Sequence, residues 1–332
     1  MPRTGTQMEA NQKYDVVIVG GGAAGLSAAL VLGRARRRVL VVDAGTPRNA
    51  PAAHMQGFLS RDGMAPSDLL AIGREEIGRY GVELVNDTVT SLERTADADR
   101  CSTTEVSYRL RLTDGPDVDA RRLLVTTGAS DDLPDISGVR ERWGRDLLHC
   151  PYCHGWEVRD EPLGVLGTID GSVQHALLVR QWSADVVFFA HTYDLSDTER
   201  QQLDARGVVV VAGEVARIVV DDDRIAGVEL VDGQVTPRTA VFVRPGIRPH
   251  LDGLLAGLGC TSDDSGFVTT DGTGRTSISG VWAAGNVADP RAQVITAAGA
   301  GSAAAIAINN DLVQADTDHA IRTDIGSCTS ST

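Results

Sequence analysis

Residues 14–25 read Tyr-Asp-Val-Val-Ile-Val-Gly-Gly-Gly-Ala-Ala-Gly, the most informative segment for the class of fold. The β-branched run before the glycines predicts a buried parallel strand, and residues 26–34 predict a helix. Between them, Gly20, Gly22 and Gly25 form the pattern GxGxxG. In the order strand, turn and helix, this pattern is typical of a dinucleotide-binding turn, because glycine permits the tight turn and the close approach of a pyrophosphate. The helix N-terminus then offers free N–H groups to the phosphates.

A carboxylate follows the next strand. Residues 38–42 predict a second strand, apolar after Arg38, which ends at Asp43, eighteen residues beyond Gly25. A carboxylate at this place accepts hydrogen bonds from ribose hydroxyls and repels a 2′-phosphate. The alternative is a glycine-rich turn that binds no nucleotide. The residues expected to contact the nucleotide here are Gly20, Gly22, Ala23, Ala24, Gly25, Asp43 and Ala44.

Length and composition restrict the class of protein. The chain has 332 residues, which suggests two domains, and its apolar fraction of 42% suits a globular protein. A net charge of −14 argues against a nucleic-acid or anionic-membrane partner. Lys13 is the only lysine, which excludes a catalytic lysine beyond it. Residues 1–13 are polar and carry no signal-peptide pattern, so we expect the protein in the cytosol.

A pair of close cysteines is the chemical centre of the sequence. Cys150 and Cys153 lie in the segment His-Cys-Pro-Tyr-Cys-His-Gly, residues 149–155. Pro151 suits the first position of a helix, and thiolates near a helix N-terminus are stabilised by its dipole, which favours thiol–disulfide exchange. A zinc half-site and an inert structural pair are the alternatives, but no second CxxC supplies further zinc ligands. The remaining cysteines are interpreted as ordinary core or surface thiols: Cys101, Cys260 and Cys328.

The C-terminal third contains a second nucleotide signal. Residues 276–286 predict a turn, a short strand and a small-residue turn, and a helix is expected from near Gln293 to about Asn310. This arrangement resembles the second FAD motif of the two-dinucleotide-domain flavoprotein disulfide reductases. The family usually has Asp at the last position, where this chain has Asn286, whose amide still bonds to a hydroxyl. Residues 124–129 resemble the strand and turn that leave the FAD domain in that family. The resemblance implies an FAD cofactor with further contacts from Arg48, Gly128, Ala129, Gly285, Asn286, Gln293 and Val294.

The position of the cysteine pair shows which members of this family the chain resembles most. The pair follows the crossover into the middle domain, as in low-molecular-weight thioredoxin reductases, whereas glutathione and lipoamide reductases carry it in the first FAD domain. The resemblance implies that Cys153 faces the flavin and that Cys150 exchanges with substrate. His154 takes the place of the acidic residue that acts as general acid and base in the family, and histidine suits that role. An ordinary exposed histidine is the alternative.

The resulting fold class is α/β, with two Rossmann-like dinucleotide-binding domains of the low-molecular-weight thioredoxin reductase type and a β-meander. We expect a discontinuous FAD domain at 14–127 and 248–312, and an inserted CxxC domain at 128–247. The meander is placed at 97–119. Residues 1–13 and 313–332 are expected to be mobile tails, and the resemblance implies a homodimer.

The middle domain departs from the NADPH-binding pattern at two places. Its first strand, residues 163–166, is followed by Gly167-Thr-Ile-Asp-Gly-Ser172, where the second glycine of the motif is replaced by Ile169. A β-branched side chain there hinders a pyrophosphate. No arginine for a 2′-phosphate occurs between Arg180 and Arg200. We therefore expect a retained domain fold without a working nicotinamide site.

This combination resembles the FAD-dependent dithiol oxidases of natural-product pathways, of the gliotoxin, holomycin and romidepsin type. Residues 150–155 match their CPxCHG motif, and Arg48-Asn-Ala-Pro51 with His54, Gly57 and Phe58 also resembles that group. His54 is either a second acid/base or a plain loop histidine. The resemblance implies that a small-molecule dithiol closes to an intramolecular disulfide, while oxygen reoxidises FAD and yields hydrogen peroxide, with no metal.

Two other functions fit the same residues. One is a thioredoxin reductase, dependent on NADPH or ferredoxin, that passes electrons from FAD to a protein disulfide. The other is a catalytically idle flavin-binding partner protein, against which the intact cysteine pair argues.

Overall fold

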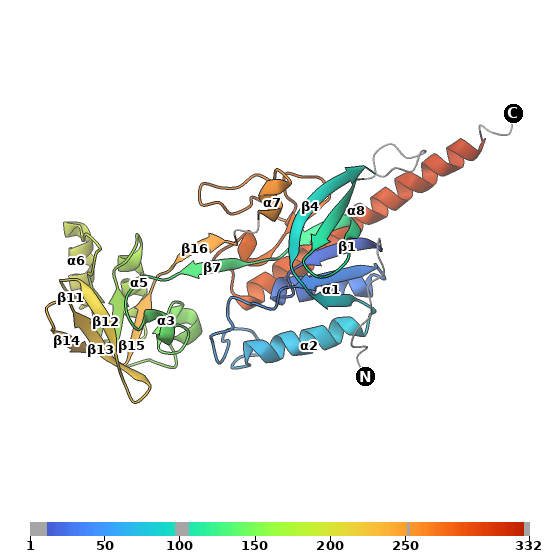
Figure 1. Ribbon diagram of the computed structural model, residues 1–332. Coiled ribbons are helices and arrows are strands. Elements are labelled where there is room, and N and C mark those ends of the chain that lie inside the picture. The colour runs from blue at the N-terminus through green and yellow to red at the C-terminus, as the bar shows by residue number, and fades with distance from the viewer. Residues whose placement is uncertain (1–11, 97–105, 251–252, 329–332) are drawn as a thin grey trace. The chain divides into compact units, whose positions relative to one another are not determined.

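The computed structural model describes residues 12–96, 106–250 and 253–328. The chain divides into two compact units (Figure 1). Unit 1 comprises residues 1–47, 67–130 and 248–332, and unit 2 comprises residues 48–66 and 131–247. The elements of unit 1 and of the two crossovers are β1 (Lys13–Val19), α1 (Ala23–Arg34), β2 (Val39–Asp43), α2 (Pro66–Gly78), β3 (Glu83–Asn86), β4 (Val89–Ala96), β5 (Val106–Leu112), β6 (Val118–Val125), β7 (Ala129–Asp132), β16 (Gly246–Pro249), α7 (Leu254–Gly257), β17 (Val281–Ala283), the 3-10 turn η1 (Gly285–Val287) and α8 (Val294–Cys328). Those of unit 2 are α3 (Val139–Arg142), β8 (Leu147–Leu148), α4 (Pro151–His154), β9 (Leu163–Leu166), α5 (Ser172–Val179), β10 (Val186–Phe189), α6 (Asp197–Ala205), β11 (Val209–Val211), β12 (Val215–Asp221), β13 (Arg224–Leu230), β14 (Val235–Pro237) and β15 (Ala240–Val243).

The main sheet of unit 1 has the order β3-β2-β1-β6-β5-β4, and β17 also pairs with β6. Strand β1 runs parallel to β2 and β6, and Val16 to Val19 stand in register with Val39 to Val42. The stretches of these strands that lie in the core are apolar because one core cluster joins them to α1, α2 and α8 while another covers the opposite face. Helices α1 and α8 pack so closely that a Cβ atom at Gly301 would collide with the backbone of Ala24.

Unit 2 repeats the same design on a smaller scale. Its parallel sheet has the order β11-β10-β9-β15-β8, and an antiparallel meander of β12, β13 and β14 accompanies it. Helix α5 follows β9 directly, as the helix of a βαβ unit does. The predicted α/β class with two Rossmann-like units is thereby confirmed. A meander is also present in unit 1 as β4, β5 and β6, although residues 97–105, including Cys101, lie outside the described residues.

The crossovers between the units run through β7 and β16, which pair as a two-stranded sheet. Residues 48–66 group with unit 2, whereas the sequence placed them in the FAD domain. The reason is side-chain contact, because Arg48 forms an ion pair with Asp131 and Pro51 packs against Gly144.

Helix α8 continues to Cys328, where the sequence predicted a tail from residue 313. Two aspartates account for part of the difference. Asp311 accepts from Arg122 and Arg275, and Asp316 accepts from Arg37 and Arg121. Polar composition alone suggested mobility, but these carboxylates lie where arginines of the sheet and of α1's end can reach them. Residues 1–11 of the other expected tail lie outside the described part of the chain.

Candidate redox and nucleotide sites

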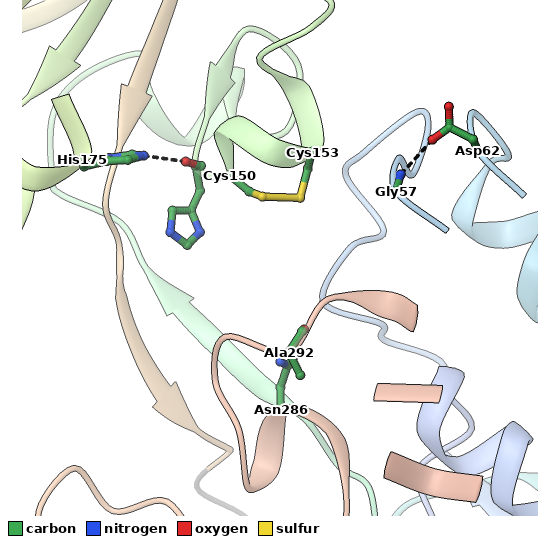
Figure 2. Close-up of a disulfide and its surroundings, with 8 residues drawn as sticks. Gly57, Asp62, Cys150, Cys153, His175, Asn286 and Ala292 are labelled. Atoms are coloured by element: carbon green, nitrogen blue, oxygen red, sulfur yellow. Dashed lines mark hydrogen bonds between the residues drawn. A yellow bond between two sulfur atoms is a disulfide. The ribbon is translucent and has the colours of Figure 1, made fainter. Parts of the chain in front are cut away.

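The cysteine pair of unit 2 is closed. Cys150 and Cys153 form a disulfide with 5.2 Å between their Cα atoms (Figure 2). Cys150 is the N-cap of α4, Pro151 takes the first helical position, and the backbone N–H groups of Cys153 and His154 both donate to the carbonyl of Cys150. This helix has a single turn, so its dipole stabilises a thiolate less than the sequence interpretation assumed. The turn itself sets the CxxC spacing for disulfide exchange.

Histidines with lowered pKa values flank the two cysteines in the sequence. Burial lowers the pKa of His154, so its imidazole is uncharged near neutrality and is able to accept a proton. Burial also lowers the pKa of His149 to about 4, and the nearby Asp131 carboxylate only partly opposes this. Arg48 and Arg244 add to the lowering because a second positive charge is disfavoured beside them. The sequence named His154 as a candidate and passed over His149.

Exposed aromatic side chains accompany the disulfide. Tyr152, between the two cysteines, and Trp156, just beyond them, are each 66% exposed. The ring of Tyr152 meets that of Trp182 edge to face at 5.5 Å, and the guanidinium of Arg159 lies 4.1 Å from the ring centre of Trp156. Aromatic side chains at the surface are suited to binding apolar ligands. Sequence inspection gave these residues no role, although their proximity to the cysteines was a usable signal.

The loop of residues 48–66 also lies in unit 2. Arg48, predicted to contact FAD, forms two hydrogen bonds to the carboxylate of Asp131, at 2.9 and 2.5 Å. His54 is exposed, and its Nδ1 lies 3.1 Å from the carbonyl oxygen of Gly63. A hydrogen bond from the Gly57 N–H to the Asp62 carboxylate also stabilises this loop (Figure 2).

The dinucleotide-type turn of unit 2 is occupied by its own side chains. The hydroxyl oxygen of Ser172 accepts from the backbone N–H groups of Thr168 and Ile169, both at 3.3 Å. In a nucleotide-binding turn, backbone donors of this kind face the phosphates. A Cβ atom on Gly171 would lie 2.8 Å from a guanidinium nitrogen of Arg244, so that side chain covers the start of α5. Ile169 is 36% exposed at the place where the motif needs glycine.

The turn of unit 1, in contrast, has the shape of a nucleotide cradle. Gly20 has φ of +108° and its Cβ position would lie 2.5 Å from the carbonyl oxygen of Thr126. A side chain at Gly25 would collide with the backbone of Gly20, whereas the space beside Gly22 is open. Ala23 and Ala24 begin α1 directly behind the turn. Only glycine fits the first and third positions, and the second leaves room for a pyrophosphate.

Asp43 lies against this turn. Its Oδ1 accepts from the Gly21 N–H at 3.2 Å, and its Oδ2 forms an ion pair with Arg74 at 2.9 Å. The orientation of the carboxylate beside the glycine turn fits the expected ribose contact. The sequence did not identify Arg74, which comes from α2, far along the chain. Ala44 follows Asp43 and is exposed.

The second motif of unit 1 comes from β17, η1 and the start of α8. Gly285 has φ of +78°, and the side-chain amide of Asn286 donates to the carbonyl of Asp289 and to that of Ala292. Figure 2 shows Asn286 beside Ala292. The Oδ1 atom of Asn286 remains an acceptor for a ribityl hydroxyl. Gln293 and Val294 stand half-buried where α8 begins.

The strand that leaves unit 1 contributes one more polar atom. Gly128 has φ of +85°, and Ala129 is buried in β7. The hydroxyl of the preceding Thr127 is buried and has no hydrogen-bond partner among the described residues. A buried polar atom without a partner needs an explanation, and a bound dinucleotide supplies one. The cradle, the acceptors and this hydroxyl together fit FAD.

Within residues 12–96, 106–250 and 253–328, no group of three or more His, Cys, Asp or Glu side chains stands close enough to hold a metal ion. Over the same ranges, no helix combines the length and the apolar character that crossing a membrane requires.

Comparison with known proteins connects these features to a family. Residues 14–302 match the family described as pyridine nucleotide-disulphide oxidoreductase. The thioredoxin reductase sirT of Leptosphaeria maculans is 32% identical over 322 residues, which cover 91% of this chain and 95% of that protein. The crystal structure of HlmI superposes with a TM-score of 0.91 at 54% identity and covers 98% of this chain and 100% of its own. The oxidoreductase of Agrobacterium tumefaciens gives a TM-score of 0.83 at 35% identity, with 91% and 99% covered. With its glycine cradle, its second motif and its disulfide in an inserted unit, the chain belongs to the pyridine nucleotide-disulphide oxidoreductase family as a thioredoxin-reductase-like FAD flavoprotein.

Proposed function

We propose that this flavoprotein is a dithiol oxidase that closes an intramolecular disulfide in a small molecule, with oxygen as the final electron acceptor. The observation that carries the proposal is the contrast between the two units. Unit 2 holds an exchangeable disulfide, while its dinucleotide-type turn is closed by Ser172 and covered by Arg244. A protein that lacks a nicotinamide site needs another electron source, and a dithiol can deliver two electrons to a disulfide by thiol–disulfide exchange.

The residues of unit 2 support a simple exchange sequence. A substrate thiolate attacks the Cys150 sulfur, and the bond between Cys150 and Cys153 breaks. The second substrate thiol then displaces Cys150, so that the substrate leaves as a disulfide and the enzyme keeps two reduced sulfurs. Thiolates are the reacting species, so a base is needed, and the neutral imidazole of His154 is placed in sequence next to Cys153 to accept that proton. His149 and His54 are further candidates.

Bound FAD supplies the chemistry that accepts two electrons from the dithiol pair and passes them to oxygen, which becomes hydrogen peroxide. The cradle at Gly20, Gly22 and Gly25 with Asp43 would hold its adenosine and pyrophosphate part. The oxygen of Asn286 and the hydroxyl of Thr127 would accept or donate hydrogen bonds along the rest of the molecule.

A small apolar substrate suits the surface beside the disulfide. Tyr152 and Trp156 expose most of their rings, and aromatic faces bind flat or apolar molecules with little loss of side-chain entropy. The motif of residues 150–155 resembles that of natural-product dithiol oxidases, which supports a substrate of this class.

The protein is also proposed to act as a homodimer. Ile295, Ile306 and Val313 of α8 are 39%, 54% and 50% exposed. Their spacings of eleven and seven residues are close to whole helical turns, so the three side chains share one face of the helix. An exposed apolar face of this length is typical of an association surface.

A thioredoxin reductase is the second candidate, because relatives such as sirT carry that name. One experiment separates the two. The purified FAD-loaded protein is mixed anaerobically with NADPH or with dithiothreitol, the loss of flavin absorbance is followed, and air is then admitted. The oxidase predicts bleaching by the dithiol alone, followed by oxygen uptake and peroxide in equal amounts. Rapid bleaching by NADPH, or reduced ferredoxin supporting thioredoxin reduction, would refute it.

A further inference from the structure

A buried histidine of α5, the helix that follows the dinucleotide-type turn of unit 2, contacts the backbone beside the cysteine pair. The Nε2 atom of His175 lies 2.7 Å from the backbone carbonyl oxygen of His149, the residue directly before Cys150 (Figure 2). His175 is the fourth residue of α5 and only 7% exposed. Because a carbonyl oxygen only accepts, Nε2 carries the proton and donates it. The contact therefore joins two segments that are 26 residues apart in sequence.

The surroundings of His175 leave this bond as its main polar interaction. Its Nδ1 has no hydrogen-bond partner among the described residues. Two aromatic rings lie edge to face with the imidazole, His149 at 5.8 Å and Phe242 at 6.0 Å between centroids. Burying an imidazole with one nitrogen unpaired is costly, so the bond that it does make has a compensating role.

We propose that His175 is a positioning residue for the disulfide, whose N–H fixes the backbone immediately before Cys150 and so holds the two cysteines at the spacing that favours the S–S bond. The proposal deepens the proposed function only in taking Cys150 and Cys153 as the redox pair. Helix α5 thereby has a new use, because its first turn is closed by Ser172 and its next turn supports the reacting sulfurs.

Losing the bond has a defined consequence for the disulfide. The backbone before Cys150 gains freedom, the effective concentration of one thiol at the other falls, and the disulfide becomes easier to reduce. A buried hydrogen bond contributes enough to change an equilibrium constant by about five- to tenfold. For a two-electron couple, a tenfold change is about 30 mV.

The test uses the full-length FAD-loaded protein and the variants His175→Leu and His175→Gln. Each is equilibrated anaerobically in a series of reduced and oxidised dithiothreitol ratios, and the free thiols of Cys150 and Cys153 are counted by alkylation and peptide mass. In His175→Leu we expect the Cys150–Cys153 disulfide to be half reduced, which defines the midpoint, at a ratio of reduced to oxidised dithiothreitol that is five- to tenfold lower than in the wild type. His175→Gln, whose amide keeps an N–H donor, is expected to lie within about twofold of the wild type.

The control is His191→Leu. The Nδ1 atom of His191 accepts a hydrogen bond from the backbone N–H of Val215 at 3.0 Å, in the same unit but away from the segment of the two cysteines. This substitution should lower thermal stability and leave the midpoint unchanged. A folded His175→Leu with the wild-type midpoint overturns the proposal, as does a His175→Gln shift as large as that of His175→Leu. If His175→Leu does not fold, His175→Asn, whose amide is too short to reach, is expected to shift the midpoint in the same direction, and no shift overturns the proposal. The measurement needs neither the substrate nor oxygen, so a failed oxidase assignment would leave its result standing.

Discussion

The side-chain nitrogen of Asn286 lies 3.0 Å from the backbone carbonyl oxygen of Ala292 and donates a hydrogen bond to it. A second bond from the same nitrogen reaches the carbonyl of Asp289 at 2.9 Å. Both bonds require an amide, because a carboxylate at this position would face two carbonyl oxygens without a proton to offer. The replacement of the family's usual Asp by Asn is therefore matched by the local backbone.

The first prediction follows from this arrangement. Asn286→Asp should destabilise the turn before α8 by about 1–3 kcal/mol, since two donors are lost and a charge faces two acceptors. Urea unfolding measures the stability and an FAD titration measures the cofactor affinity. We expect both the free energy of unfolding and the FAD affinity to decrease. Asn309→Asp is the matched control, because Asn309 accepts from Arg37 through its oxygen and a carboxylate there keeps the bond. Equal stability of the two variants would contradict the prediction.

The second prediction concerns the reacting sulfurs. Cys153→Ser should reduce flavin bleaching by dithiothreitol by about 100-fold or more, on the scale of removing a reacting group. Cys150 keeps a thiol in this variant, so its thiolate should attack an added small symmetrical disulfide, releasing one half as thiol and keeping the other as a mixed disulfide that is visible as added mass. Cys260→Ser is the control, because Cys260 is a free, half-buried thiol in unit 1. Full activity in Cys153→Ser would remove the disulfide from the mechanism.

The third prediction is a dependence of stability on pH. Burial lowers the pKa of His175 from 6.5 to about 4, so the unfolded chain binds a proton that the folded chain refuses between these values. Its contribution to stability is complete above pH 6.5 and is lost as the pH falls toward 4, by at most ~3 kcal/mol. Urea unfolding with excess FAD at pH 7 and pH 5 should show a smaller loss for His175→Gln than for the wild type. The neighbouring His149, Arg244 and Phe242 are unchanged in this comparison, and an identical loss in both proteins would show that His175 does not titrate in this way.

The fourth prediction compares two aspartates of α8. Asp311 neutralises Arg122, whose side chain is 9% exposed, whereas Asp316 pairs with Arg37 and Arg121 nearer to solvent. Asp311→Ala leaves a buried guanidinium without its carboxylate and should cost about 3 kcal/mol, while Asp316→Ala should cost about 1 kcal/mol or less. Thermal unfolding in low and high salt tests the order, and a reversed order would contradict the burial argument.

The fifth prediction concerns association. Ile306→Glu and Val313→Glu place charges on the exposed apolar face of α8 and should shift the protein from dimer to monomer in sedimentation or light scattering. Gln314→Glu adds the same charge to the same helix beside Val313, but not at one of the apolar positions of that face, and should leave the mass unchanged. A monomeric wild type would end the proposal of a homodimer.

Much of the fold followed from short sequence patterns. The strand before Gly20, the strand at residues 163–166 and the small-residue turn at Gly285 were each predictable because glycine spacing and β-branched runs act locally. The contacts of Arg74 with Asp43, of Arg48 with Asp131 and of His175 with His149 were not, because they join residues 26 to 83 positions apart.

The helical extent of α8 escaped prediction for a related reason. Its last turns are polar, and composition cannot distinguish a solvated tail from a helix whose carboxylates meet arginines of the sheet. The departure of unit 2 from the NADPH-binding pattern, in contrast, was predictable from Ile169 and from the absence of arginine between Arg180 and Arg200, although the contacts of Ser172 required the structure.

The hydroxyl of Ser172 has a consequence for how this lineage can change. Replacing Ile169 with glycine would leave the turn's donors engaged, and removing Ser172 would leave the β-branched obstruction. Neither substitution alone is expected to open this turn to a pyrophosphate, so neither would by itself give selection a gain on which to act. Engineering pyridine-nucleotide dependence into this scaffold would therefore require both changes together, with the Arg244 side chain displaced as well.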